Sequence, residues 1–234
     1  MKKTAIDLFC GAGGLSEGFR QAGFHILAGN DIDENAGKTY SITHSDAKFL
    51  LGPIQSISAQ ALMNAAGLSP GELDVLIGGP PCQAYSVYNH QRGMHDERAN
   101  LFREYLRIVE GTQPNWVVME NVTGISSIAN GAIVETIKSE FNRLGYTMNH
   151  AVLKAEEYGV PQERRRIFFI GTKTGMPINF PIKTHGLELI PFTNIWDAIG
   201  DLPFVENGNI PDNVNYACDS KSWYQRYLRG DCSK

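Results

Sequence analysis

The sequence predicts an α/β protein with a mostly parallel, doubly wound sheet, and two patterns support this fold class. Short apolar runs of strand length alternate with segments whose apolar residues recur at helical spacing, and the runs end in loops rich in glycine or proline. A chain of 234 residues with 42% hydrophobic content can bury one main core. We therefore expect a main domain over residues 1–175, followed by a linker and lead-in segment over residues 176–234.

The amino-acid composition argues against a nonspecific nucleic-acid-binding protein, a disulfide or metal protein, and a membrane protein. The chain has 21 basic and 25 acidic residues, and its net charge of -4 argues against nonspecific coating of nucleic acid, although a local basic face is compatible with it. The four cysteines form no CxxC pair and the six histidines show no ligand spacing, so neither disulfides nor a metal site are predicted. No apolar stretch approaches the ~20 residues of a membrane span. We expect a cytoplasmic protein that has no membrane partner.

The first predicted strand and helix enclose a glycine-rich loop. Residues 4–9 form an apolar run, the loop follows at residues 10–14, and helical spacing continues up to Gly23. A second strand at residues 24–30 delivers Asp31 about 20 residues after the first loop glycine, the offset at which a Rossmann-like unit places an acid for a ribose. The loop lacks the endings typical of phosphate and dinucleotide sites. It therefore favours a nucleoside ligand such as S-adenosyl-L-methionine, with a plain tight connection as the alternative.

The next motif is a stiff turn that precedes a thiol. After a weakly patterned region, with a helix expected at residues 58–66 and an ill-defined strand near 49–57, the apolar run Val75–Ile77 ends at Gly-Gly-Pro-Pro and Cys82. Prolines fix φ and donate no amide, which suits a loop that holds a reactive group at a sheet edge. A lone cysteine is usually a small buried hydrophobe. Because Cys82 follows this turn, we favour the interpretation that it is a nucleophile.

A carboxylate ends the next strand. Residues 88–97 are polar and predict a mobile loop, and residues 101–109 predict a helix. A buried strand at residues 116–119 then delivers Glu120 to the carboxyl edge, where open α/β sheets gather their sites. A glutamate that points into solvent is the alternative, but the neighbouring Cys82 favours a functional carboxylate.

Three consecutive arginines enter the last predicted strand of the main domain. A helix at residues 133–144 and a strand at 146–153 precede them, and the strand at 167–170 follows. Such a run is usually a solvated face or a phosphate contact. On a strand, Arg164 and Arg166 share one side while Arg165 faces the other. Beyond it we expect a short helix at residues 195–199 and a polar end at 202–234 without a closing element.

Five motifs together resemble those of the DNA (cytosine-5) methyltransferases: DLFCGAGG at 7–14, GGPPCQAYS at 78–86, DERANLF at 96–102, ENV at 120–122 and PQERRRIFFIG at 161–171. The resemblance implies a Rossmann-like, S-adenosyl-L-methionine-dependent methyltransferase fold, with S-adenosyl-L-homocysteine as product. It implies that residues 1–175 bind cofactor and catalyse, and that 176–234 lead toward a target-recognition region. It also implies duplex DNA as partner and a place in a restriction-modification system.

The resemblance further implies roles for individual residues. Cys82 is the expected nucleophile, and Glu120 is expected to hold a proton at ring nitrogen 3 of cytosine. Arg164 and Arg166 are expected to hold the base and the active-site loop. The expected cofactor residues are Phe9, Gly11, Gly13, Gly14, Asp31, Ile32, Ile54, Pro80 and Leu101. The chain departs from the family at Gly52-Pro53-Ile54, where Gly-Asp-Ile is common.

Two alternative functions are compatible with the sequence, and two segments typical of the family are not found in it. The same chemistry on tRNA is the first alternative, although the Cys-Phe-Thr marker of that branch is absent from the sequence. A catalytically silent cofactor-binding module is the second, and such a module needs neither Cys82 nor Glu120. The family's target-recognition region and its returning Gln-x-Gly-Asn segment are not found in these 234 residues. We therefore expect little activity from them alone, and restoration by a C-terminal complementing polypeptide.

Overall fold

The structure is a computed structural model that describes residues 2–81, 99–126, 131–208 and 215–231. It forms two compact units, one made of Met1–Val152 and Arg166–Phe180, the other of Leu153–Arg165 and Pro181–Lys234. Within the described ranges, no helix is long and apolar enough to span a membrane. The same ranges hold no group of three or more His, Cys, Asp or Glu side chains arranged to bind a metal ion.

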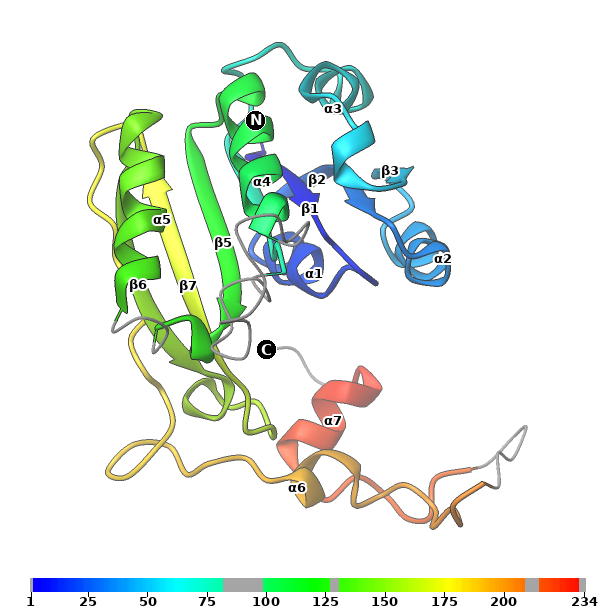
Figure 1. The fold of residues 1–234 in the computed structure, drawn as a ribbon. Coiled ribbons are helices and arrows are strands. Elements are labelled where there is room, and N and C mark those ends of the chain that lie inside the picture. The colour runs from blue at the N-terminus through cyan, green and yellow to red at the C-terminus, as the bar shows by residue number, and fades with distance from the viewer. Residues whose placement is uncertain (1, 82–98, 127–130, 209–214, 232–234) are drawn as a thin grey trace. The chain divides into compact units, whose positions relative to one another are not determined.

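A mixed sheet organises the first unit (Figure 1). Its order is β3-β2-β1-β4-β5-β7-β6. The strands are β1 Thr4–Leu8, β2 His25–Asp31, β3 Lys48–Leu51, β4 Val75–Gly78, β5 Trp116–Val122, β6 Thr147–Lys154 and β7 Arg165–Thr172. The pairs β1/β2, β1/β4, β2/β3 and β4/β5 are parallel, whereas β5 and β7 are antiparallel. The predicted, mostly parallel sheet is confirmed.

Helices cover both faces of this sheet. They are α1 Gly14–Gln21, α2 Glu34–Thr43, α3 Ala59–Ala66, α4 Ala99–Thr112 and α5 Ala132–Arg143, with the 3-10 turns η1 Ile54–Ser56 and η4 Thr123–Ser126. Apolar side chains of α3, α4 and α5 pack on one face in the larger core cluster, around Tyr105 and Phe141. Leu15 and Phe19 of α1 pack on the other face. Burial of these apolar stripes fixes the helices to the sheet.

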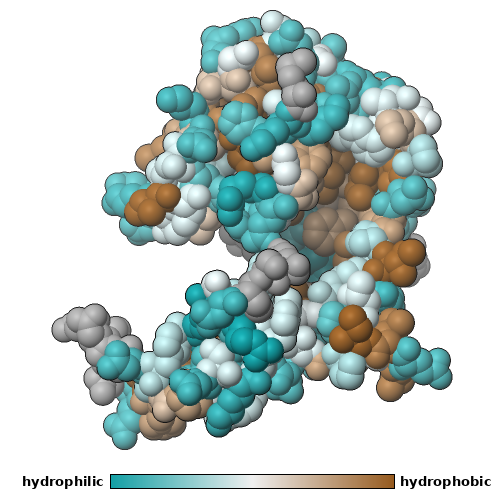
Figure 2. Space-filling view, turned by 180° about the vertical axis from the view of Figure 1, so that it is seen from behind, coloured by the Kyte–Doolittle hydropathy of each residue, from teal (hydrophilic) through white to brown (hydrophobic). Residues whose placement is uncertain are grey.

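The α1 face has a much smaller core than the opposite face. Its buried members are Ala5, Ile26, Val75 and Ile77. Beside them lies a largely apolar pocket of about 330 Å³, lined by Lys3, Phe19, Phe24, Asp74, Val75, Asn115, Trp116, Val118, Thr174 and Met176. Seen from behind, hydrophobic atoms reach the surface between hydrophilic ones (Figure 2). Part of this sheet face is therefore apolar surface that the described residues leave open.

Two helices are absent from the sequence-based prediction. Helix α2 follows the predicted strand at residues 24–30, where no helix was predicted, and Asp33 caps it by accepting hydrogen bonds from the amides of Asn35 and Ala36. The expectation that residues 202–234 lack a closing element is wrong. Helix α7, Trp223–Arg229, forms there behind a capping box in which Ser222 and Gln225 satisfy each other's backbone amides.

In the second unit, α7 packs on the predicted short helix α6, Ile195–Ile199. Arg229 donates two hydrogen bonds to the buried Asp201 carboxylate, at 2.7 and 3.2 Å, and its guanidinium lies 4.3 Å from the centre of the Tyr216 ring. Glu157 lies within the 3-10 turn η6, Ala155–Tyr158, and forms ion pairs with Lys154 and Lys183. Polar clamps of this kind stabilise a unit that has little apolar core.

Candidate active site

The segments that follow β1, β2, β4 and β5 meet at the carboxyl edge of the sheet because these strands are parallel. Leu8 pairs with Asn30 on one side and with Gly78 on the other, and Gly78 pairs in turn with Met119. The amide of Gly79 donates to the Leu8 carbonyl at 3.3 Å. The glycine loop, the end of β2, the Gly-Gly-Pro-Pro turn and the end of β5 therefore lie next to one another.

The glycine loop has an unusual backbone. Phe9 has a φ of 56°, and Gly11 and Gly13 have φ values of 52° and 93°. A left-handed conformation at a bulky residue such as Phe9 is costly and is typical of functional sites. Among the described residues, the amides of Ala12, Gly14 and Leu15 have no hydrogen-bond acceptor. Their position at the N-terminus of α1 suits a negatively charged ligand group.

Asp31 lies directly against this loop. Its Oδ2 accepts the amide hydrogen of Gly11 at 2.7 Å, and its Oδ1 accepts that of Asp33 at 2.9 Å. A carboxylate offers about four acceptor positions, so two are still open for the hydroxyls of a ligand. The neighbouring Ile32 is exposed. The structure thus brings Asp31 and the loop together, while the cofactor roles of both stay predictions.

The turn after β4 is held by the ENV segment. A Cβ at position 78 would lie 2.7 Å from the Leu8 carbonyl oxygen, so only glycine fits there. A Cβ at position 79 would lie 3.4 Å from Oε2 of Glu120. The buried Asn121 donates from Nδ2 to the Pro80 carbonyl at 2.9 Å. The predicted nucleophile Cys82 and the polar segment at 88–97 lie outside the described residues.

Glu120 forms an ion pair with Arg166, with 2.9 Å between Oε1 and Nε. Register explains the contact: Val122 is opposite Arg166, so Glu120 and Arg166 are diagonal neighbours on the same face of the antiparallel β5/β7 pair. Both side chains are about one quarter exposed. The pair fixes the direction of the carboxylate beside the turn. Arg164 precedes β7 and belongs to the second unit, so its proposed role stays a prediction.

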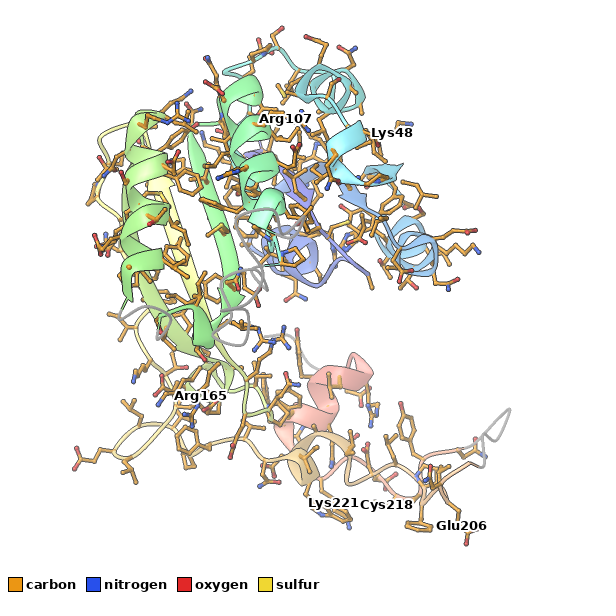
Figure 3. The ribbon with its side chains drawn as sticks, viewed as in Figure 1. Lys48, Arg107, Arg165, Glu206, Cys218 and Lys221 are labelled. Carbon is orange, nitrogen blue, oxygen red and sulfur yellow. The ribbon has the colours of Figure 1, made fainter. Side chains whose placement is uncertain are left out.

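The remaining predicted cofactor residues differ in position. Pro80 and Ile54 are buried, Ile54 within the main core, and Leu101 of α4 is half-buried against that core. Sequence reasoning missed Arg107, which donates from Nη2 to the carbonyls of Ile54 and Ile57 at 2.9 Å each and so braces η1 from α4 (Figure 3). A single arginine on a helix gives no sequence signal for such a role.

Sequence reasoning also missed Asp7, although a charged residue inside an apolar strand is a signal. Its side chain is buried on β1 beneath the glycine loop. Burial raises the pKa of Asp7 to about 7, two hydrogen bonds from Ser16 lower it, and the charge of Asp31 raises it. Burial also raises the pKa of the Cys10 thiol, which keeps that thiol protonated.

Comparisons with known proteins agree with this arrangement. A family model described as C-5 cytosine-specific DNA methylase matches residues 3–229. The Type II methyltransferase M.AgeI of Thalassovita gelatinovora is 36% identical over 98% of this chain and 58% of its own length. The Type II methyltransferase M.AquIA of a Picosynechococcus strain is 36% identical over 87% of this chain and 90% of its own length.

Solved structures of methyltransferases have a similar fold. A prophage-encoded protein from E. coli, assigned as a DNA modification methyltransferase, superposes with a TM-score of 0.77 at 27% identity, covering 97% of this chain and 64% of that one. The Dnmt2 methyltransferase of S. pombe has a TM-score of 0.59 at 16% identity over 76% of this chain and 52% of its own, which supports the fold alone. This chain thus spans about 58% of M.AgeI and a larger share of M.AquIA. Because the family model covers nearly all of the sequence, the chain belongs to the family of C-5 cytosine-specific DNA methylases.

Proposed function

We propose that the protein transfers a methyl group from S-adenosyl-L-methionine to carbon 5 of cytosine in duplex DNA, as the modification enzyme of a restriction-modification system. One observation carries the proposal. The Glu120–Arg166 pair and Asn121 lie against the Gly78–Pro81 turn that leads into Cys82, beside the glycine loop. Family membership and relatives named Type II methyltransferases support the same reaction.

The residues around the loop fit the proposed cofactor. Asp31 would accept hydrogen bonds from the ribose hydroxyls, and the open amides of Ala12, Gly14 and Leu15 would receive the carboxylate. Neither Asp7 nor Asp31 has a Lys or Arg partner among the described residues, which is favourable for a cation. When bound, S-adenosyl-L-methionine supplies an electrophilic methyl group on a sulfonium.

The chain's own residues must activate the cytosine. Carbon 5 is a poor nucleophile, so the Cys82 thiolate would add at carbon 6 and make carbon 5 enamine-like. A free cysteine has a pKa of about 8.5, so the turn must stabilise the thiolate. Glu120 would hold a proton at ring nitrogen 3, where addition places charge, and Arg166 would keep its carboxyl oriented. After methyl transfer, loss of the carbon 5 proton expels Cys82.

The target base must leave the duplex for this chemistry, since the thiol cannot reach carbon 6 of a stacked base. The test is transfer of a labelled methyl group to duplex DNA, followed by nucleoside analysis, with a C-terminal polypeptide from a relative present. We expect 5-methylcytosine from DNA and none from tRNA. Labelled 5-methylcytosine in tRNA alone would contradict the proposal in favour of the RNA alternative.

Asp31→Ala is expected to weaken S-adenosyl-L-homocysteine binding at least tenfold. The change removes two charge-assisted hydrogen bonds worth roughly 1.5 to 3 kcal/mol each, and about 1.4 kcal/mol corresponds to a factor of ten. It also frees the Gly11 amide that Asp31 holds at 2.7 Å. Isothermal calorimetry measures the affinity. Asp33→Ala, which only uncaps α2, serves as the control, and equal affinities in the Asp31 variant and the parent would refute the ribose role.

A further inference from the structure

A buried polar chain runs behind the glycine loop. Asp7 Oδ2 accepts hydrogen bonds from the Ser16 amide at 3.1 Å and from the Ser16 hydroxyl at 2.7 Å. The Ser16 hydroxyl also lies 3.1 Å from the Tyr40 hydroxyl. All three side chains are at most 1% exposed. Gly13, the N-cap of α1, has no side chain that could accept a hydrogen bond. Asp7 on the neighbouring strand β1 caps the helix instead, because it accepts from the Ser16 amide in the first turn of α1.

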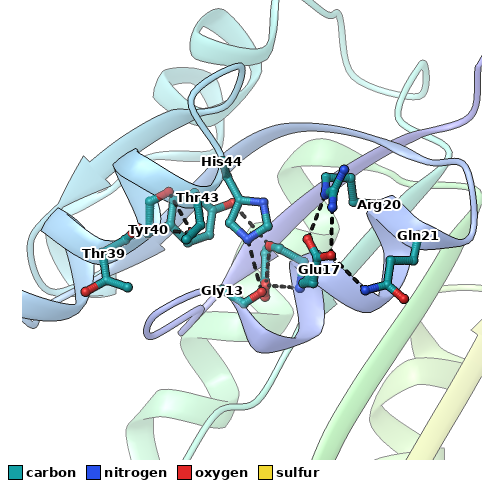
Figure 4. A network of polar contacts seen from close by, with 10 residues as sticks. Gly13, Glu17, Arg20, Gln21, Thr39, Tyr40, Thr43 and His44 are labelled. Atoms are coloured by element: carbon teal, nitrogen blue, oxygen red, sulfur yellow. Dashed lines mark hydrogen bonds and ion pairs between the residues drawn. The ribbon is translucent and has the colours of Figure 1, made fainter. Parts of the chain in front are cut away.

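Helix α2 completes the contact with the loop (Figure 4). His44 Nε2 lies 3.2 Å from the Gly13 carbonyl and must donate to it, because a carbonyl oxygen only accepts. The rings of Tyr40 and His44 are 4.8 Å apart. A Cβ at position 13 would lie 2.4 Å from His44, so the left-handed loop residue is enclosed on this side. The shape of the loop therefore depends on the side-chain contacts that link Asp7, Ser16, Tyr40 and His44.

Asp7 has no Lys or Arg partner within the described ranges of the chain. Its Oδ1 is buried and has no hydrogen-bond partner in the part of the chain that the structure describes. The titratable groups around it are the Cys10 thiol on the loop, Asp31 at the end of β2, Tyr40 on α2, His44 at the C-cap of α2, and Tyr105 on α4 across the sheet. Arg20, the basic residue of α1, is paired with Glu17 on the exposed side of that helix. Two carboxyl groups, Asp7 and Asp31, thus influence each other at the loop without a described cationic partner.

We propose that Asp7 is a positioning residue that, together with Asp31, makes the loop select the cationic cofactor over its neutral product. The inference rests on the proposed function, in which a sulfonium compound enters and a thioether leaves. A bound cation offsets the repulsion between the two carboxylates and favours the ionised form of Asp7. A neutral thioether gives no such compensation. Ionised Asp7 also binds Ser16 more strongly, since hydrogen bonds to a charged acceptor are stronger than those to a neutral one.

The test compares the affinities of S-adenosyl-L-methionine and S-adenosyl-L-homocysteine by calorimetry from pH 6 to pH 8. The carboxylate form binds the cation better, so the ratio of the two affinities should rise with pH through the range in which Asp7 titrates. Each unit by which the cation lowers the pKa of Asp7 changes that ratio by a factor of about ten. Using the ratio cancels titrations that the two ligands share.

Asp7→Asn keeps the shape of the side chain but cannot ionise, so its affinity ratio should stay flat from pH 6 to pH 8. Asp74→Asn is the matched control, because Asp74 also accepts from an amide and a hydroxyl, those of Thr4, at the opposite edge of the sheet. Ser16→Ala removes one hydrogen bond that favours the carboxylate, and it should move the rise in the ratio to higher pH. This second variant preserves the test if the Asn variant unfolds.

A pH-dependent ratio in the parent and in Asp74→Asn, but not in Asp7→Asn, supports the inference. A flat ratio in the parent, or an unchanged rise in Asp7→Asn, overturns it while leaving the proposed function intact, because both ligands still bind. An unmoved midpoint in Ser16→Ala overturns the link through Ser16. Absence of binding by both ligands at every pH overturns the proposed function, and the inference with it.

Discussion

Cys82→Ser is expected to abolish methyl transfer to DNA. A thiol near its ordinary pKa is a few per cent thiolate at neutral pH and is intrinsically very nucleophilic, whereas a serine hydroxyl is scarcely ionised. The substitution changes one atom at the residue that follows the Gly78–Pro81 turn in sequence, and this turn is fixed by Asn121 and by the close approach of Gly78 to Leu8. A large effect therefore reports on chemistry. Labelled methyl transfer, with the complementing C-terminal polypeptide present, measures it.

The covalent step has its own readout. DNA that contains 5-fluorocytosine cannot lose fluorine as the normal base loses its proton, so the adduct with Cys82 should persist and be seen as a slow band under denaturing conditions. Cys218→Ser is the control, because Cys218 is a partly exposed free thiol in the second unit. The Cys218→Ser variant should still form the covalent adduct with this DNA. Burial raises the pKa of the Cys10 thiol, so this thiol should not replace Cys82 as the nucleophile. A trapped adduct in Cys82→Ser would rule out the assignment.

The strand ends were predictable because each site residue follows a local apolar run. Asp31, Glu120 and the Gly78–Pro81 turn all close such runs, and parallel strands bring their carboxyl ends to one edge whatever the strand order. The Glu120–Arg166 contact was not predictable in the same way. It depends on β7 inserting antiparallel beside β5, and a pattern of alternation does not reveal register.

The helices that the sequence prediction missed lack a strong apolar pattern, and their caps alone do not predict them. Helix α2 has a weak apolar stripe, and it is held by its Asp33 cap and by Tyr40, which is fully buried against Gly29. Helix α7 had a local signal in its Ser222 and Gln225 capping box, but it lies among polar residues. Asp7 carried a signal as a charged residue in an apolar strand, but its link through Ser16 to Tyr40 joins residues of different elements and could not be predicted. Burial, and not local preference, decides such positions.

Residues 1–234 alone are expected to show little or no DNA methylation. The resemblance implies a returning C-terminal segment, and the pocket of about 330 Å³ beside Trp116, Val118 and Met176 is the apolar surface that we expect it to cover. Open apolar surface of this kind promotes self-association. The net charge of -4 also gives little general affinity for phosphates, which supply nearly all nonspecific binding to DNA.

A C-terminal polypeptide from a relative that extends beyond the matched region, such as M.AgeI, should restore methylation when added in trans, and should reduce self-association in sedimentation measurements. Met176→Asp places a charge in the apolar pocket and should weaken this rescue several-fold, because the arriving segment would have to bury an unpaired carboxylate. Leu187→Asp, at an exposed position of the second unit, should leave the rescue unchanged. Equal rescue of the Met176 variant would show that this pocket is not the contact surface. Efficient, sequence-specific methylation by residues 1–234 without any added polypeptide would show that they already contain what the reaction needs.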